Sequence, residues 1–208
     1  MNIFEKGNYK PIPPNFRIRG FSALEELTKF QKEFNIWDTD TTINEIRDSI
    51  VANYLGFDLL NFDKHGFDAK KSQEDKFLEV KQCSFFSKSW SGTWNDTNEE
   101  KAKAFMTDKV YTALGIWKGA SDLQFIVFGK NKKLGEYLLK KIKDAKANRR
   151  RSTQTISINK MIKEYGFNVI VPPDKKKEDI YKLLIMHNRN FSKILKIEDI
   201  KSIEDVEI

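Results

Sequence analysis

"GFDAKKSQEDKFLEVKQ", residues 66–82, is the stretch that decides the fold. Its end, residues 77–82, has the composition of a short β-strand, with Val80 pointing toward a packed side. Its beginning, residues 67–70, is a second extended piece, and a polar loop separates the two. This order predicts an antiparallel hairpin.

Two charged residues, Glu79 and Lys81, alternate with Val80 inside the predicted strand. Residues two apart in a strand project from the same face, roughly 7 Å apart. The sequence pattern of an acid two residues before a lysine carries little information by itself, because it recurs along the chain. The other copies are Asp68–Lys70, Glu74–Lys76, Glu99–Lys101, Asp144–Lys146, Asp174–Lys176 and Asp199–Lys201. Apart from Asp68–Lys70, those copies lie in polar loops, on helix surfaces or in the acidic tail. An edge strand with one solvated face would explain the pair without any function.

A functional explanation needs a further carboxylate, and the hairpin would bring Asp68 beside Glu79. Such a cluster suits phosphodiester hydrolysis, because Mg²⁺ prefers one or two carboxylates together with water and substrate oxygens. The metal neutralises phosphate oxygens and generates hydroxide near pH 7. A lysine beside it can orient or deprotonate the attacking water and stabilise charge in the transition state.

The segment Gly66-Phe67-Asp68, ten intervening residues and Glu79-Val80-Lys81 resembles the PD-(D/E)XK nuclease motif. Within that superfamily the chain length and the following helix resemble a type II restriction endonuclease, with the match spanning about residues 42–128. Phe67 departs from the usual proline. The resemblance implies Asp68 and Glu79 as metal ligands, Lys81 as the catalytic lysine and Mg²⁺ as cofactor.

Three further residues leave alternatives open. Asp63 also follows a phenylalanine and would replace Asp68 if the hairpin register differed. Family members often add an acid from the helix before the sheet, which makes Glu45 a further candidate catalytic residue. Thr42-Ile43-Asn44-Glu45 is equally a capping box, with Glu45 in a purely structural role. Gln82 faces away from Lys81 by strict alternation and is only a possible neighbour of the site.

Composition narrows the class of protein. The formal net charge is +7 with a pI near 9.2, which favours a polyanionic partner such as nucleic acid. A single cysteine, Cys83, excludes an internal disulfide and argues against a cysteine-based zinc site. There is no apolar run long enough to cross a membrane and no secretion signal at the start, so we expect a cytoplasmic protein without a membrane partner.

The order of elements predicts an α/β fold, a central mixed sheet flanked by helices with a restriction-endonuclease-like core. We expect one nuclease domain over residues 1–208, with its catalytic core at about 42–128 and a DNA-recognition part at about 129–208. The first twenty residues are expected to form an irregular arm. Expected helices cover residues 22–34, 42–55, 98–107, 132–148, 161–165 and 180–195, and expected strands cover 57–62, 67–70, 77–82, 109–117, 123–128, 153–158 and 169–171.

Two segments are candidates for DNA contact. Residues 83–97, expected to be a loop leaving the active edge, offer Lys88, Ser89 and Asn95, although its aromatic residues would equally fill gaps in the core. The basic run after residue 148 offers Arg149, Arg150 and Arg151, followed by Gln154. Arginine and glutamine side chains can pair with base edges, but phosphate contact is the more general expectation.

The resemblance and the basic charge favour a Mg²⁺-dependent type II site-specific deoxyribonuclease of a restriction-modification system, which cuts both strands of duplex DNA as a homodimer. The resemblance also implies that it leaves 5′-phosphate ends. A structure-selective repair or junction nuclease of the same superfamily is the first alternative. A basic DNA-binding protein without catalysis is the second, with Glu79 and Lys81 as an exposed ion pair.

Overall fold

The structure is a computed structural model that describes residues 15–60, 66–71, 73–95, 97–150 and 152–206. The chain divides into two compact units, one up to Ile43 and one from Asn44 onward. The helix α2 (Thr39–Tyr54) begins in the first unit and continues into the second.

The first unit consists of α1 (Phe16–Phe34) and the start of α2. Asn35 ends α1 in the left-handed conformation, which asparagine tolerates better than most residues, and its N–H donates to the Gln31 carbonyl. The predicted helix over residues 22–34 is therefore confirmed. The predicted irregular arm is wrong for residues 16–20, which are helical, and residues 1–14 lie outside the described part.

The start of α2 corrects the predicted capping box. The helix begins at Thr39, where the Asp38 carboxylate accepts a hydrogen bond from the Thr41 N–H at 2.7 Å. Thr42 lies buried within the helix, and its hydroxyl donates to the Asp38 carbonyl oxygen at 2.7 Å. Glu45 is therefore not a capping residue. The helix ends before Gly56, whose φ of +69° gives the predicted stop.

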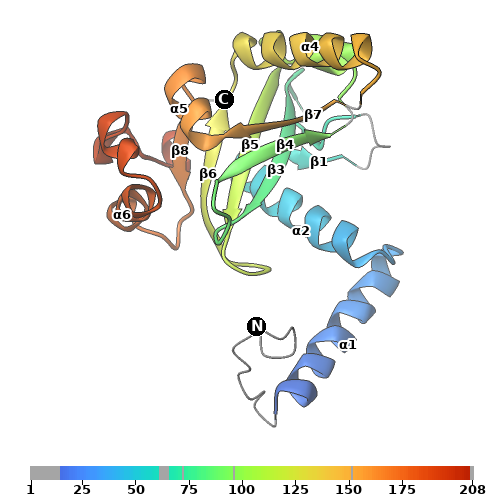
Figure 1. The fold of residues 1–208 in the computed structure, drawn as a ribbon. Coiled ribbons are helices and arrows are strands. Elements are labelled where there is room, and N and C mark those ends of the chain that lie inside the picture. Colours follow the sequence, from blue (N-terminus) through green and yellow to red (C-terminus); the bar gives the residue numbers. More distant parts are fainter. Residues whose placement is uncertain (1–14, 61–65, 72, 96, 151, 207–208) are drawn as a thin grey trace, which may run out of the picture. The chain divides into compact units, whose positions relative to one another are not determined.

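Seven strands among the described residues form one mixed sheet in the order β1-β2-β3-β5-β6-β8-β9 (Figure 1). The pairs β3–β5 and β8–β9 are parallel, and the other neighbours are antiparallel. The predicted α/β class with a mixed central sheet is confirmed. The strands are β1 (Asp58–Leu59), β2 (Ala69–Lys70), β3 (Phe77–Ser84), β5 (Val110–Trp117), β6 (Leu123–Gly129), β8 (Asn168–Val171) and β9 (Lys201–Ser202).

Helices cover both faces of this sheet. On one face, Val51 of α2 and Leu55, the residue after that helix, pack in the same apolar cluster as Val80 of β3. On the other, a larger cluster joins the sheet to α3 (Glu99–Ala104), α4 (Lys132–Ala147), α5 (Ile158–Tyr165) and α6 (Lys177–His187). Leu134 and Leu138, four residues apart on α4, are fully buried in it, as helical periodicity predicts.

A separate two-stranded ribbon pairs β4 (Ser91–Asn95) with β7 (Thr153–Ser157). Residues 91–95 are therefore a strand, and the prediction of a loop over residues 83–97 is wrong there. Trp94 on β4 is 1% exposed, so it is a core residue. The local sequence hides this strand because its partner lies about sixty residues further along the chain.

The C-terminal region is more interrupted than predicted. The helix α6 ends at His187, because Asn188 is extended and its side chain caps the 3₁₀ turn that follows. The short 3₁₀ turns are η2 (Arg189–Lys193), η3 (Ile197–Asp199) and η4 (Ile203–Asp205). Among the residues the structure describes, no helix has the length and apolar character needed to cross a membrane.

Candidate active site

The predicted hairpin forms and places the motif. Ala69 of β2 lies opposite Leu78 of β3, and the Asp68 N–H donates to the Leu78 carbonyl at 3.0 Å. The Asp68 carboxylate turns back and accepts the Val80 N–H at 2.6 Å. β2 pairs with β3 only at Phe77 and Leu78, so within the described residues Glu79 and Lys81 have a strand neighbour on the β5 side alone. The face that carries the two charges is nevertheless largely buried, so the explanation by an edge strand with a solvated face is wrong.

Glu79 is buried between two ammonium groups. Its side chain is only 4% exposed, with Lys81 Nζ 2.6 Å from Oε1 and Lys101 Nζ 2.7 Å from Oε2. Burial by itself raises the pKa of Glu79, but the charges of Lys81 and Lys101 outweigh it, and the pKa ends below its usual value. Glu79 is therefore a buried carboxylate that stays ionised.

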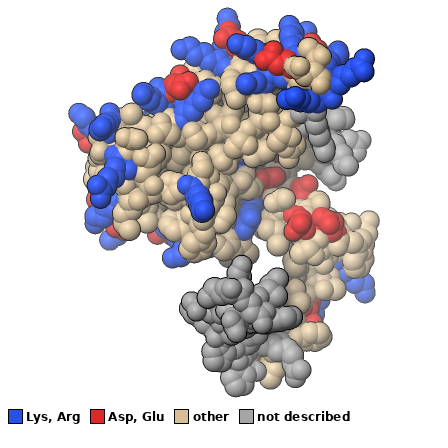
Figure 2. All heavy atoms as spheres, viewed as in Figure 1, with Lys and Arg blue, Asp and Glu red and all other residues tan. Residues whose placement is uncertain are grey.

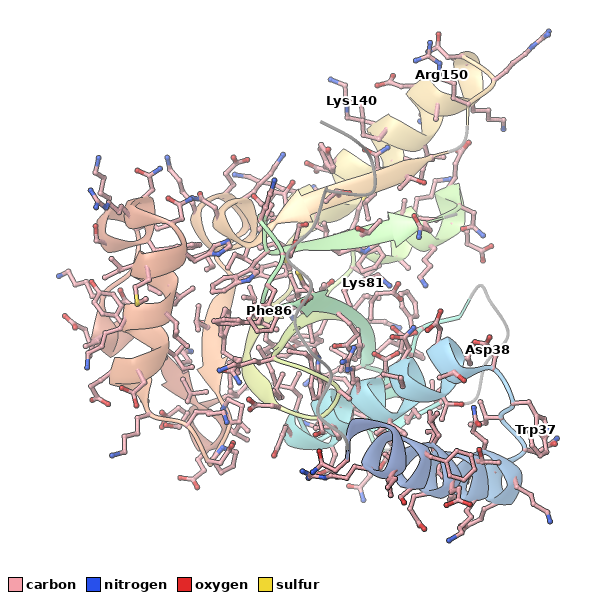
Figure 3. All side chains as sticks on the ribbon, turned by 60° about the horizontal axis from the view of Figure 1, so that its bottom comes forward. Trp37, Asp38, Lys81, Phe86, Lys140 and Arg150 are labelled. Atoms are coloured by element: carbon pink, nitrogen blue, oxygen red, sulfur yellow. The ribbon has the colours of Figure 1, made fainter. Side chains whose placement is uncertain are left out.

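Lys81 is held in its charged form by the acids around it. Burial favours the neutral amine, but the opposite charges of Glu79, Asp68 and Asp48 and the hydrogen bond to Glu79 prevail, so the pKa of Lys81 is raised. Figure 3 shows Lys81 inside the molecule among the strands. The lysine enters the site as an ammonium group.

Two other carboxyl groups behave in the opposite way. Burial, followed by the charge of Glu79, raises the pKa of Asp68 to about 6, with Lys81 and the Val80 N–H opposing the shift. Burial, followed by the charge of Asp68, raises the pKa of Asp48 to about 7, against the Gln82 hydrogen bond and Lys81. The site thus contains carboxyl groups that titrate near neutral pH, which is typical of functional sites.

A polar chain under α2 positions Asp48. The Gln82 side-chain amide donates to the Asp48 carboxylate and accepts a hydrogen bond from the Trp117 indole N–H. Gln82 points away from Lys81, as predicted. Its contact with the site is the hydrogen bond to Asp48 on α2. Sequence reasoning missed Asp48, although it follows Glu45 by three residues and so lies on the same side of the helix.

These side chains meet at a cavity of about 190 Å³. Its wall combines charged groups from α2, β3 and α3 with Asp68, the residue before β2, and the predicted candidate Glu45 is among them. Lys101 was missed, because nothing in the sequence near it indicates that α3 lies over the end of the hairpin. The cavity is lined by Glu45, Asp48, Leu59, Leu60, Gly66, Phe67, Asp68, Glu79, Lys81, Asn95 and Lys101.

The donor set is suited to a hard divalent cation. Among the described residues no group of three or more His, Cys, Asp or Glu side chains has the geometry of a metal site. Mg²⁺ usually takes only one or two carboxylates, completing its shell with water and substrate oxygens. Asp68 and Glu79 supply two, and the buried Oε2 of Glu79 accepts no hydrogen bond within the described part, having only the ion pair with Lys101. The residues therefore fit Mg²⁺, with Asp68 and Glu79 as its holders.

The predicted DNA contacts lie at several places on the molecule. Asn95 ends β4, is exposed and lines the same cavity as Glu79. Lys88 and Ser89 are exposed beyond the C-terminal end of β3, outside the cavity lining. Gln154 is half-buried in β7, opposite Trp94. Asp63, the alternative first acid, lies outside the described residues.

The basic run lies at the end of α4. Arg149 and Arg150 are exposed there, and Arg151 lies outside the described residues. Figure 2 shows lysines and arginines gathered over α4, and Figure 3 shows Lys140 and Arg150 at its outer side. The segment leads into β7, whose first residue, Thr153, pairs with Asn95. The exposed lysines of α4 are Lys132, Lys133, Lys140, Lys143 and Lys146.

No family model matches the sequence, and no curated protein matches it either. The resemblance to PD-(D/E)XK nucleases therefore stays a prediction that depends on the motif residues of the sequence.

Proposed function

We propose that the protein is a Mg²⁺-dependent endonuclease that cuts duplex DNA at a specific short sequence, as a type II restriction enzyme does. The supporting observation is the hairpin itself, which brings Asp68, Glu79 and Lys81 to one cavity with Glu79 ionised and Lys81 protonated. The mixed sheet would then be a restriction-endonuclease-like core.

Each side chain has a role in this proposal. Bound Mg²⁺ would supply Lewis acidity and an activated water. Asp68 and Glu79 hold the ion, and the Val80 N–H fixes Asp68 at 2.6 Å. Lys81, whose pKa is raised, acts as an ammonium group that orients the water and stabilises charge on the phosphate.

The proton of the attacking water needs an acceptor, and Asp48 suits this role better than Lys81. A general base works best with a pKa near the operating pH, and the pKa of Asp48 is about 7. Its hydrogen bond from Gln82 fixes its orientation beside the cavity. Attack in line with the departing 3′ oxygen would leave a 5′-phosphate end.

The surface around the cavity agrees with a duplex DNA partner. The net charge of +7 and the lysines along α4 attract phosphates without regard to sequence. In this proposal Asn95 at the cavity and Arg149 and Arg150 at the end of α4 contact the DNA near the cut. Cutting both strands of a palindromic site would require two copies of the site, and hence a two-fold homodimer.

The test is digestion of a long duplex DNA of known sequence with Mg²⁺, beside Ca²⁺ and EDTA lanes. Lys81→Met removes the ammonium group and keeps the length of the side chain. Lys182→Met, at a side chain that is 73% exposed on α6, is the matched control for loss of one lysine.

We expect discrete fragments from the wild type and from Lys182→Met with Mg²⁺, and intact DNA from Lys81→Met. A smear of products that needs Mg²⁺ and Lys81 would indicate structure-selective cleavage instead of sequence-specific cleavage. The DNA could instead stay intact in every lane and show a salt-sensitive mobility shift that Lys81→Met leaves unchanged. This result would indicate a DNA-binding protein without catalysis.

A further inference from the structure

Lys101 comes to the site from a separate element, and packing fixes its position. It lies on α3, whose start is capped by the Asn98 side chain. The neighbouring Ala102 is fully buried against α4, where a Cβ on Gly135 would come within 2.7 Å of the Ala102 carbonyl oxygen. Only glycine permits this approach of the two helices, so the backbone at Lys101 has little freedom to shift.

Among the described residues, the ammonium group of Lys101 makes three direct contacts, and its charge also acts on Asp68, although less than that of Lys81 does. It lies 2.7 Å from Glu79 Oε2, donates a hydrogen bond to the Gly66 carbonyl at 2.7 Å and lies 5.3 Å from the centre of the Phe67 ring. The carbonyl and the ring are uncharged groups that also attract a cation. Lys101 therefore has partners that do not depend on Glu79.

A divalent cation on Glu79 would conflict with this arrangement. Both carboxylate oxygens already face ammonium groups, Lys81 at Oε1 and Lys101 at Oε2. A metal ion bound to either oxygen would have a like charge within a few ångströms, in a cavity where burial weakens screening. One of the two ammonium groups has to leave Glu79 when the ion enters.

The geometry identifies Lys101 as the one that leaves. The other charged neighbours of Lys81 are Asp68 and Asp48, the acids of the site itself, so moving Lys81 would only transfer it to another proposed ligand. Lys101 can instead keep the Gly66 carbonyl and the Phe67 ring. Lys81 also has to remain beside the reacting phosphate.

We propose that Lys101 is a resident counter-ion, which holds the Glu79 carboxylate in place in the metal-free site and is exchanged for the divalent cation. This role rests on the metal site of the proposed function. It makes Lys101 a positioning residue, one that acts on the metal through Glu79 and lowers the affinity of the site for the ion.

The experiment measures binding of the metal alone to the full chain, without DNA. Calorimetric titrations with Ca²⁺ and with Mg²⁺ would compare the wild type, Lys101→Met and Lys101→Arg. Lys103→Met, at an exposed position on the same helix, is the matched control. Melting curves of each protein in EDTA and in excess Mg²⁺ provide a second readout.

We expect Lys101→Met to bind Ca²⁺ and Mg²⁺ about tenfold more tightly or better, because the competing charge is gone. In EDTA it should melt below the wild type, since Glu79 has lost one of its two partners, and Mg²⁺ should raise its melting temperature by more than it raises that of the wild type. Lys101→Arg and Lys103→Met should resemble the wild type.

Equal or weaker metal binding by Lys101→Met, with wild-type binding intact, would overturn the exchange and leave the proposed nuclease standing. A lower melting temperature of Lys101→Met with no larger gain from Mg²⁺ would make Lys101 purely structural. If no protein binds either ion and the wild type does not cut DNA with Mg²⁺, both the metal site and the proposed function fail.

Discussion

β3 and β5 are adjacent parallel strands of eight residues, paired in register from Phe77 opposite Val110 to Ser84 opposite Trp117, and they are built on different principles. All eight residues of β5 are buried and none is charged. β3 contributes Leu78 and Val80 to the core beneath α2 but turns Glu79 and Lys81 to its other face. The neighbouring strand β5 thus shows that a strand in the centre of this sheet can be built without charged residues.

This difference in charge indicates that the two strands have different roles. Burial of apolar surface makes β5 a source of stability, at roughly 25 cal/mol per Å². A buried ion pair is often no more stabilising than apolar residues of the same volume, because both charges lose their hydration. Fold stability alone therefore gives no reason for Glu79 and Lys81, and the cavity they line does.

Substitutions at paired positions separate the two roles most strongly. Lys81 lies opposite Leu114. We expect Lys81→Met to reduce DNA cleavage by about 10²–10⁴-fold, as loss of a catalytic group does. Leu114→Ala should lower the free energy of unfolding by about 2–5 kcal/mol, because it leaves a cavity in the core.

Denaturant unfolding and cleavage rates per folded molecule measure both effects. Leu114→Ala should cleave within a few-fold of the wild type well below its melting temperature, since Lys101 and Asp68 stay in place around Glu79. Equal losses of activity in both variants would mean that the two strands do not divide stability and chemistry between them.

The pKa of Asp48 predicts how the metal-free protein responds to pH. The folded state holds this proton up to about pH 7 and the unfolded chain releases it near pH 3.8. Stability from this group is therefore complete below about pH 4 and is lost as pH rises through 7, a change on the order of 4 kcal/mol. Asp48→Asn stays neutral, so its unfolding free energy should fall less over the same range.

Urea unfolding in EDTA between pH 4 and pH 8 checks this. Asp108→Asn, at a fully exposed carboxylate, is the control and should follow the wild-type profile. If Asp48→Asn and the wild type show parallel profiles, Asp48 is already ionised at low pH and is unsuited to be the general base.

The smallest expected effect is at Thr112, which lies on β5 directly opposite Glu79. Its hydroxyl is buried and has no hydrogen-bond partner within the described residues. Thr112→Val keeps the shape and removes the hydroxyl, so we expect a gain in unfolding free energy of about 1 kcal/mol with cleavage unchanged. Calorimetric melting and the digestion assay measure the two quantities. A loss of cleavage with unchanged stability would instead assign Thr112 to the site.

The sequence by itself determined the local parts of this protein. Hydrophobic periodicity identified α4, and largely apolar runs identified the strands β5 and β6, because each pattern is contained within its own element. The hairpin could be predicted, and with it the meeting of Asp68 with Glu79 and Lys81, since the loop between its strands is short. The side of α2 that carries Glu45 also followed from the sequence, although the start of that helix did not.

Only the tertiary structure decided which distant groups complete the site. Lys101 approaches Glu79 because α3 packs against α4 at Gly135, and Asp48 is fixed through Gln82 because α2 covers the sheet. β4 exists as a strand because β7 returns to pair with it. Such contacts join segments far apart in the chain, and their energy depends on packing and burial that no local pattern encodes. For the same reason the raised pKa values of Asp48 and Asp68 follow only from the folded structure, where burial and the charges of other segments act on them.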